Sequence, residues 1–493
     1  MSASAPSSAV RFLLDGELHT VSGLPASMTV LEYLREHAGR VGTKEGCAEG
    51  DCGACTVVVG ELQGNDIGYR AINACIRFLP SIDGKALITV EGLRGKDGSL
   101  HPVQQAMVDQ HASQCGYCTP GFVMSLLAVY LNNPAPARAQ VVDALSGNLC
   151  RCTGYRPIID AGCSMGSYPA PAHLSPEEAR SSARREALQA IQRDVALALP
   201  GFTAPRTLEE CAAAFAAAPD SLILAGGTDI GLWVTKHLRA LPPIIYIGDV
   251  AELQHISSDE SGITIGAAAS LSTAWAALVA AYPALAELAR RFASVPVRNS
   301  GTLCGNIANG SPIGDAMPAL IALGASITLR RGSTARELAL DTFYIRYGVK
   351  DLQTGEFVQS VTVPTPKAGQ QFACYKLSKR IDQDISAVCA AFAVTVADGV
   401  VSSARLAYGG MAGTPARARH AEAALLGQPW AEASINAAIT ALAQDFTPLS
   451  DMRASHHYRL HAAGNLLRRF YLQHGGSTAC LRIEDALAME GSA

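Results

Sequence analysis

Hydrophobic and polar residues alternate near the N-terminus in the pattern of β-strands. Phe12 and Leu14 alternate into an Asp15-Gly16 turn, which predicts a β-hairpin. A short helix and three more strands are expected at residues 30–37, 56–59, 70–79 and 86–91. Residues 1–92 are therefore predicted to form one compact, mostly β unit.

The pattern changes to helical spacing over residues 93–167. Pro102 and Pro120 stand where the first turn of a helix would begin, and Thr119 is placed to cap the second of these helices. Apolar residues recur at helical spacing at positions 122, 123, 126, 127 and 130. A further helical hairpin is expected over residues 138–149 and 155–165, so this unit is predicted to be helical.

The rest of the chain divides into a linker and two mixed units. Residues 168–194 are rich in Pro, Ala and Ser, which is typical of a linker, and the charge run at 177–186 indicates a solvated face. Residues 195–369 read as an α/β unit with glycine-rich turns at 226–231 and 301–314, and residues 370–493 as an α+β unit. The expected fold class is thus multidomain α+β.

Composition limits the possible partners and the compartment. A net charge of −4, with no basic cluster among aromatic residues, argues against nucleic acid. No signal-peptide core is present, and the uncharged stretch 263–286 fits a strand over 262–268 and a packed helix better than a membrane span. Fourteen cysteines without a secretory signal indicate a reducing compartment, the cytoplasm.

Eight of the cysteines fall into two sets of four. The first set, Cys47-x4-Cys52-x2-Cys55 with Cys75, has the spacing of plant-type [2Fe–2S] ferredoxins. Gly46, Gly50 and Gly53 in the same loop allow backbone N–H groups to turn toward an anionic cluster. Zinc is the alternative, but zinc ribbons prefer two C-x2-C pairs and this loop has one.

The second set is Cys115-x2-Cys118 with Cys150-x-Cys152, in a helical context. Both pairs lie at expected helix N-termini, whose free N–H groups favour an anionic cluster. Four cysteines are also a common zinc ligand set, and the neighbouring first set makes a second redox centre the better interpretation. The other six cysteines are read as small buried hydrophobic residues, at positions 163, 211, 304, 374, 389 and 480.

These motifs carry a specific resemblance. Residues 46–55, 114–121 and 148–155 resemble the iron–sulfur part of the molybdenum hydroxylases, the family of xanthine dehydrogenase, aldehyde oxidase and carbon monoxide dehydrogenase. The resemblance implies a ferredoxin-like β-grasp domain (1–92), a four-helix [2Fe–2S] domain (93–167), an FAD-binding domain (195–369) and a C-terminal flavoprotein domain (370–493). It covers nearly the whole chain.

Two glycine-rich loops extend the resemblance to the flavin. A glycine pair after the apolar run 222–224 permits close approach of backbone N–H groups to a pyrophosphate, and a second such loop follows at 299–306. By resemblance, the FAD contacts are Ile223, Leu224, Ala225, Gly226, Gly227, Thr228, Asp229, Ile230, Thr302, Leu303, Cys304, Gly305, Asn306 and Asp315. Phe292 corresponds to an aromatic residue beside the isoalloxazine ring, and Val358 to a backbone contact.

One flavin position departs from the relatives. Ala387 stands where vertebrate relatives carry a lysine near the flavin, so Lys376 and Lys379 become candidates for neutralising reduced flavin. No nucleophile–His–carboxylate set is found, as expected of a redox relay without a general acid or base. The histidines at 456, 457 and 461 are read as surface or packing residues.

The resemblance also implies partners and a direction of electron flow. One-chain relatives continue into a much longer molybdenum domain, so the substrate-oxidising site is expected on a large partner subunit, in a heterotetramer of two small and two large chains. Electrons from hypoxanthine or xanthine would pass from the molybdenum cofactor through the second and first clusters to FAD and then NAD⁺. The same relay serving an aldehyde or N-heterocycle hydroxylase, and a zinc-stabilised scaffold without redox function, remain as alternatives.

Overall fold

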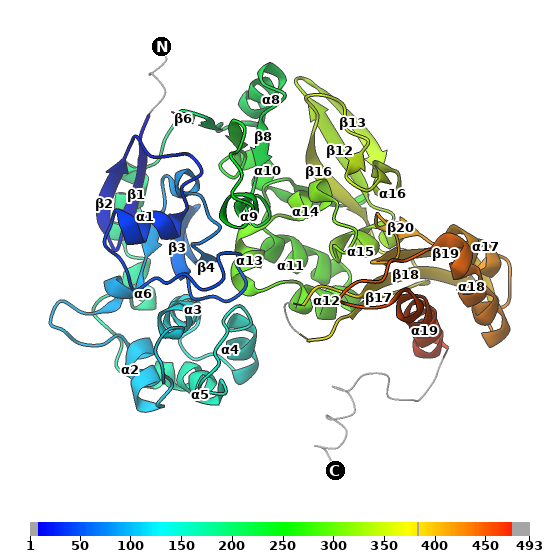
Figure 1. Cartoon of the computed structure of the whole chain (residues 1–493), viewed down its shortest axis with the longest axis horizontal. Coiled ribbons are helices and arrows are strands. Elements are labelled where there is room, and N and C mark those ends of the chain that lie inside the picture. Colours follow the sequence, from blue (N-terminus) through cyan, green and yellow to red (C-terminus); the bar gives the residue numbers. More distant parts are fainter. Residues whose placement is uncertain (1–7, 382–383, 476–493) are drawn as a thin grey trace.

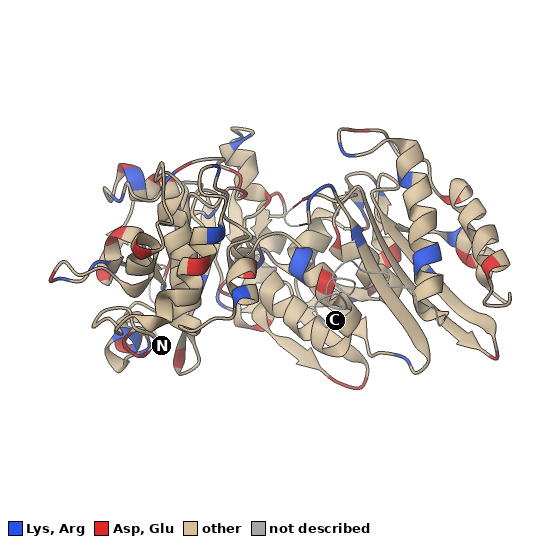
Figure 2. Ribbon diagram, turned by 90° about the horizontal axis from the view of Figure 1, so that it is seen from below, with Lys and Arg blue, Asp and Glu red and all other residues tan. Residues whose placement is uncertain are grey.

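The computed structural model describes residues 8–381 and 384–475, arranged as four units along the long axis of the molecule (Figure 1). The mostly β unit and the helical unit lie side by side at one end, the third unit occupies the middle, and the fourth forms the other end. The predicted fold class is confirmed. Acidic and basic residues alternate along the ribbon in Figure 2, and neither kind is confined to one unit.

The first unit is a mixed five-stranded sheet in the order β2-β1-β5-β3-β4. Its elements are β1 (Val10–Leu14), β2 (Glu17–Val21), α1 (Val30–Glu36), β3 (Thr56–Gln63), β4 (Asp66–Asn73) and β5 (Ala86–Ile88). The predicted hairpin forms at Asp15-Gly16, where both residues have positive φ. The strand predicted over 70–79 is wrong beyond Asn73, because the chain turns there to bring in Cys75.

The second unit contains the four predicted helices. They are α2 (Pro102–Asp109), α3 (Thr119–Asn132), α4 (Arg138–Ala144) and α5 (Arg156–Ser164). Proline occupies the first turn of α2 and α3 as predicted. The helix expected over 138–149 ends at Ala144, because the following residues leave the helix and Leu149 donates its N–H to the carbonyl of Cys52.

Residues 168–194 are folded against the first two units, although their composition is that of a linker. They form α6 (Pro176–Ala179) and α7 (Ser182–Ala190). Leu174, Ala179 and Leu188 are buried in a core shared with α3 and with one face of the first sheet. The charge run is not wholly solvated, since Arg184 pairs with Glu178 at 2.8 Å.

The third unit combines two sheets. The four-stranded sheet has the order β6 (Leu197–Leu199), β7 (Phe202–Ala204), β9 (Ile244–Tyr246) and β8 (Leu222–Leu224). The five-stranded sheet has the order β10 (Ile256–Ser258), β11 (Gly262–Gly266), β16 (Phe357–Pro364), β12 (Ser326–Arg331) and β13 (Thr334–Ala339). A two-stranded hairpin stands apart, β14 (Tyr344–Arg346) with β15 (Val349–Lys350).

Nine helices accompany these sheets within the described residues. They are α8 (Leu208–Ala217), α9 (Ile230–Thr235), α10 (Ala251–Gln254), α11 (Leu271–Ala281), α12 (Ala286–Arg291), α13 (Val295–Ser300), α14 (Leu303–Asn309), α15 (Ala316–Leu323) and α16 (Leu340–Phe343). The uncharged stretch 263–286 forms β11 and α11, as predicted. No helix in the described part of the chain has the length and apolar character needed to cross a membrane.

The fourth unit is an antiparallel sheet covered by three helices. The sheet has the strand order β17 (Gln370–Leu377), β18 (Val388–Ala397), β19 (Val400–Gly409) and β20 (Ala416–Arg417). It packs against α17 (Arg419–Leu425), α18 (Glu432–Asp445) and α19 (His456–His474). His456, His457 and His461 are exposed on α19, in agreement with the surface interpretation.

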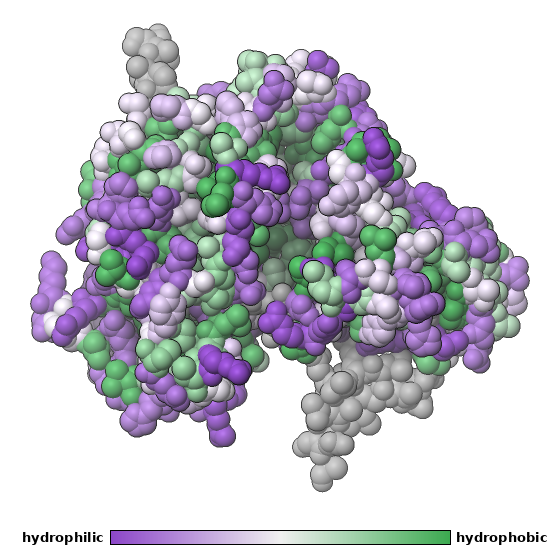
Figure 3. Space-filling model, in the orientation of Figure 1, coloured by the Kyte–Doolittle hydropathy of each residue, from purple (hydrophilic) through white to green (hydrophobic). Residues whose placement is uncertain are grey.

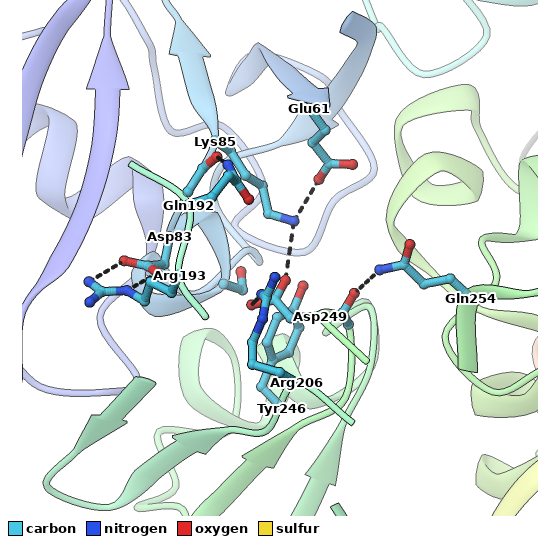
Figure 4. A network of polar contacts seen from close by, with 12 residues as sticks. Glu61, Asp83, Lys85, Gln192, Arg193, Arg206, Tyr246, Asp249 and Gln254 are labelled. Carbon is cyan, nitrogen blue, oxygen red and sulfur yellow. Dashed lines mark hydrogen bonds and ion pairs between the residues drawn. The ribbon is translucent and has the colours of Figure 1, made fainter. Parts of the chain in front are cut away.

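The first sheet is buried on both faces, and a polar network joins it to the third unit. One face packs against the helical unit and the other against α1 and strands β7 to β9. At this junction Lys85 lies between two carboxylates, 2.7 Å from Glu61 of β3 and 3.7 Å from Asp249 of the third unit (Figure 4). Close by, Arg193 pairs with Asp83, and both side chains are buried.

Candidate functional site

The four cysteines of the first set meet beside the first sheet. Cys47, Cys52 and Cys55 lie in the loop between α1 and β3, and Cys75 follows β4. The thiol of Cys47 contacts those of Cys52 and Cys75, and the thiol of Cys55 contacts that of Cys75. Sulfurs that are far apart in sequence are thus brought together, and Cys47 and Cys75 each contact two of the others.

Hydrogen bonds in this loop stabilise negative charge on sulfur. The backbone N–H groups of Glu49 and Cys52 donate to Sγ of Cys47 at 3.4 and 3.3 Å. The contacts with the Cys52 and Cys75 thiols, and then these amides, lower the pKa of Cys47 well below its usual range. The thiolate is the form of cysteine that binds metal, so these contacts favour the ligating state of Cys47. The same thiol contacts raise the pKa of Cys52 and Cys75.

The second set also assembles, at the surface of the helical unit. Cys115 contacts Cys152, and Cys118 contacts Cys150. Burial opposes ionisation of Cys150, but the hydroxyl of Thr153, 3.1 Å from Sγ, and neighbouring N–H groups outweigh it and lower the pKa. Cys115 and Cys152 are exposed, whereas Cys55 and Cys75 of the first set are buried.

Each set of four neighbouring cysteines fits a [2Fe–2S] cluster. Four cysteines shared by two irons give two sulfurs to each iron, whereas structural zinc takes all four around one point. When bound, such clusters supply one-electron transfer, and the eight cysteines are the residues that would hold them.

The loop of the first set touches the segment that carries the second. The N–H of Leu149 donates to the carbonyl of Cys52 at 3.0 Å, and the amide of Asn148 donates to the carbonyl of Gly53 at 3.2 Å. Gly53 has a φ of 71°, and a Cβ on it would lie 2.2 Å from the carbonyl oxygen of Gly147. One hydrogen bond and one peptide link therefore join Cys52 to Cys150.

On its other side, the first set touches the glycine-rich turn at 226–231 and helix α9. A Cβ on Gly231 would lie 2.6 Å from the carbonyl oxygen of Ile76, the residue after Cys75. Thr235 donates its hydroxyl to the carbonyl of Ala48 at 2.7 Å, and Lys236 donates to that of Cys47 at 3.0 Å. The first cysteine set thus lies between the second set and the glycine-rich turn.

A cavity of about 610 Å³ lies between the two glycine-rich loops of the third unit. It opens near the middle of the face shown in Figure 3, where the floor of the hollow is hydrophobic. Most predicted FAD contacts line it: Ile223, Ala225, Gly226, Gly227, Thr228, Asp229, Ile230, Phe292, Thr302, Cys304, Gly305, Asn306 and Val358. The two loops approach so closely that a Cβ on Gly226 would lie 1.9 Å from the carbonyl oxygen of Ser300.

Four predicted contacts do not line this cavity. Leu224 and Leu303 are buried in hydrophobic cores. Lys376 forms a buried ion pair with Asp315, and Ser386 hydrogen-bonds to both side chains. The other candidate cation, Lys379, donates to the carbonyl of Met452 at the surface, and Ala387 is buried.

The side chain of Asn306 tests whether the cavity fits a cofactor. Its amide oxygen is buried and has no hydrogen-bond partner among the described residues. A buried amide oxygen without a partner is costly, and a hydroxyl group of a bound dinucleotide would supply the missing donor. The cavity therefore fits FAD, which would supply electron and hydride transfer when bound.

Sequence reasoning missed several lining residues and misjudged some cysteines. Phe215, Trp233, Lys350 and Glu356 also line the cavity, but no local motif marks them because they come from four separate elements. Cys163 is exposed, contrary to the prediction for the single cysteines, whereas those at 211, 304, 374 and 389 are buried. Cys374 and Cys389 contact each other on adjacent strands, and position 480 lies outside the described residues.

Family models match four consecutive parts of the chain. A 2Fe-2S iron-sulfur cluster binding domain matches residues 12–78, and a [2Fe-2S] binding domain matches residues 89–163. The FAD binding domain in molybdopterin dehydrogenase matches residues 195–366, and the CO dehydrogenase flavoprotein C-terminal domain matches residues 373–474. The chain thus contains two types of iron–sulfur domain and an FAD-binding domain.

Similar proteins include xanthine dehydrogenase of Emericella nidulans and xanthine dehydrogenase/oxidase of Mus musculus, each 32% identical to this chain. The matches cover 89% and 88% of this chain but 36% of each relative, so the chain spans about a third of their length. A chain of carbon monoxide dehydrogenase from Hydrogenophaga pseudoflava is 31% identical with a TM-score of 0.51, and covers 54% of this chain and 94% of its own length. Quinoline 2-oxidoreductase of Pseudomonas putida 86 is 25% identical with a TM-score of 0.50, covering 56% of this chain and 97% of that one.

Proposed function

We propose that this chain, which belongs to the molybdenum hydroxylase family, is the electron-transfer subunit of a cytoplasmic xanthine dehydrogenase. In this proposal electrons from hypoxanthine or xanthine reach FAD from a molybdenum cofactor on a large partner subunit, through two [2Fe–2S] clusters, and leave to NAD⁺. Cys47, Cys52, Cys55 and Cys75 hold one cluster. The set from Cys115 to Cys152 holds the other, and the cavity between the glycine-rich loops holds FAD.

The observation that carries the proposal is the order of the three sites. The loop of the first set contacts residues 147–149 on one side and the glycine-rich turn on the other. The second set, with Cys115 and Cys152 exposed, forms the open end of this row. In such an arrangement, electrons can be transferred from a docked protein to the second set, then to the first set, and finally to the flavin.

The identity of the substrate and of the partner is supported by the relatives. Those that match most of this chain are named xanthine dehydrogenases, which favours hypoxanthine and xanthine. In carbon monoxide dehydrogenase, a similar chain of about half this length is separate within a molybdenum enzyme. A molybdenum-bearing companion chain is therefore proposed here, in a complex of two small and two large subunits.

Purification of the native complex under anaerobic conditions tests the proposal. Four irons and one flavin per chain, a molybdenum-bearing companion chain and reduction of NAD⁺ by xanthine are the expected results. A colourless protein that contains zinc would contradict the redox function, because zinc–thiolate sites do not absorb visible light. A coloured complex that reduces NAD⁺ only with other substrates would contradict the xanthine assignment alone.

A second candidate keeps the relay and changes the substrate. Solved structures with a similar chain include carbon monoxide dehydrogenase and quinoline 2-oxidoreductase, so the same subunit type serves several hydroxylases. Comparing turnover of xanthine, an aldehyde and an N-heterocycle by one preparation, with NAD⁺ or O₂ as acceptor, decides between these enzymes.

A further inference from the structure

Lys350 on β15 is the only cationic side chain among the described residues that line the FAD cavity. Two carboxylates, Asp229 and Glu356, line the same cavity. Glu356 is already neutralised by Arg336, whose guanidinium lies 2.8 Å away. Asp229 and Lys350 are therefore the charges that a bound ligand would meet.

The ammonium group of Lys350 has no bonding partner among the described residues, while the stem of its side chain is packed. Within residues 8–381 and 384–475, no hydrogen bond or ion pair reaches its Nζ. Its stem packs over the end of α14, since a Cβ on Gly310 would lie 2.9 Å from Cε of Lys350. Burial lowers the pKa of Lys350, and the nearby Asp229 carboxylate partly offsets this effect. A partly desolvated cation of this kind gains strongly from an anionic partner.

FAD brings that anion, because its diphosphate is doubly negative. The glycine-rich turn offers backbone N–H groups to a phosphate but no full positive charge. The same turn contains Asp229, whose carboxylate would repel the phosphate. A cation that lines the same cavity is needed to offset both charges, and among the described lining residues Lys350 alone supplies one.

We propose that Lys350 anchors the diphosphate of FAD and thereby joins the β14–β15 hairpin to the glycine-rich turn. The inference rests on the proposed FAD site and adds a residue to it that lies outside both glycine-rich loops. Lys350 acts here as a binding residue, and electron transfer itself needs nothing from it.

Titration of the FAD-depleted full chain with FAD and with riboflavin, which lacks phosphate, tests the inference. Replacing Lys350 by Met should raise the Kd for FAD about 10- to 100-fold, as expected for the loss of a charged hydrogen bond. Riboflavin affinity should stay unchanged. Lys350→Arg should retain most of the affinity, and the exposed control Lys367→Met should match the wild type.

Salt dependence and hydrogen exchange give independent readouts. The FAD affinity of the wild type should fall with salt more steeply than that of Lys350→Met, because one ion contact is missing from the variant. FAD should also protect the amides of residues 344–350 in the wild type and not in the variant. Equal losses for FAD and riboflavin would assign Lys350 to packing and overturn the inference, as would unchanged FAD affinity. Failure of the wild type itself to bind FAD would instead overturn the proposed function.

Discussion

Replacing Lys85 by Met should loosen the junction between the first sheet and the third unit. Lys85 lies between Glu61 and Asp249, at 2.7 and 3.7 Å, and its side chain is 12% exposed. Methionine keeps most of the packing volume but removes the charge. The two carboxylates would then face each other across the junction, each with one remaining guanidinium partner, Arg70 for Glu61 and Arg206 for Asp249.

The expected loss follows from burial. Removing one partner of a fully buried ion pair costs about 3–5 kcal/mol, and partial exposure with the remaining arginines reduces this to about 2–3 kcal/mol. A loss of 1 kcal/mol lowers the midpoint of thermal unfolding by roughly 2–4 °C in a cooperative unit of about 150–250 residues, so the midpoint should fall by about 4–12 °C. Loss of cluster absorbance on heating reports on the two cysteine-bearing units.

The pH dependence has a defined sign. Burial opposes ionisation of both groups, but Lys85 and Arg70 outweigh it and lower the pKa of Glu61, while Glu61, Tyr246 and Asp249 raise that of Lys85. A lowered carboxyl pKa gives stability that is present above its ordinary value of 4.5 and is lost as the pH falls. A raised lysine pKa gives stability that is present below 10.5 and is lost as the pH rises above it. The difference between wild type and variant should therefore be full near neutral pH and shrink toward either limit.

Scanning calorimetry and cluster absorbance at several pH values check this prediction. Arg138→Met is the matched control, since it breaks a solvent-exposed pair with Asp160 and should leave the midpoint unchanged. If Lys85→Met unfolds at the same midpoint as the wild type near neutral pH, the ion pairs at the junction contribute nothing and the reasoning is refuted.

Three more changes address the cofactor sites separately. Cys150→Ala should halve the iron content and remove one cluster signal from the electron paramagnetic resonance spectrum while flavin stays. Gly226→Val should deplete flavin and spare iron, because its side chain would collide with the carbonyl of Ser300, and the flavin-to-iron ratio measures this. Asn148→Leu should keep all cofactors but leave the buried Ser125 hydroxyl without its acceptor and remove the Asn148 donor from the Gly53 carbonyl, which keeps Thr56 as a donor. The expected cost is about 1–3 kcal/mol in unfolding, with slower electron transfer between the clusters in freeze-quench experiments.

Features set by local chemistry could be predicted from the sequence. Cysteine spacing indicated both ligand sets, and proline marked the start of α3. The prediction that Thr119 caps this helix is wrong, because Thr119 is its first residue and Cys118 occupies the N-cap position without a side-chain cap. Alternation marked the hairpin between β1 and β2. Each of these signals lies within a few neighbouring residues, where geometry follows directly from residue type.

Features set by tertiary packing could not be predicted. Residues 168–194 have the composition of a linker, yet they fold because neighbouring units offer Leu188 a core. Nothing around Lys350 indicates a cavity, since most of the other lining residues come from segments about 40 to 135 residues away along the chain. The end of α4 at Ala144 likewise depends on a contact with Cys52, far back in the sequence.

The unequal burial of the two cysteine sets has a consequence for how the protein matures. Cys55 and Cys75 are 1% and 2% exposed beneath the third unit, whereas Cys115 and Cys152 remain open to solvent. Cys47 and Cys52 are half-buried, so an assembly factor that delivers iron and sulfide can reach all four sulfurs of the inner set only before the units close over Cys55 and Cys75. It can reach the outer set afterwards. We expect a brief pulse of labelled iron during synthesis to enter the inner cluster first, and iron stripped from the finished protein to return only to the outer one.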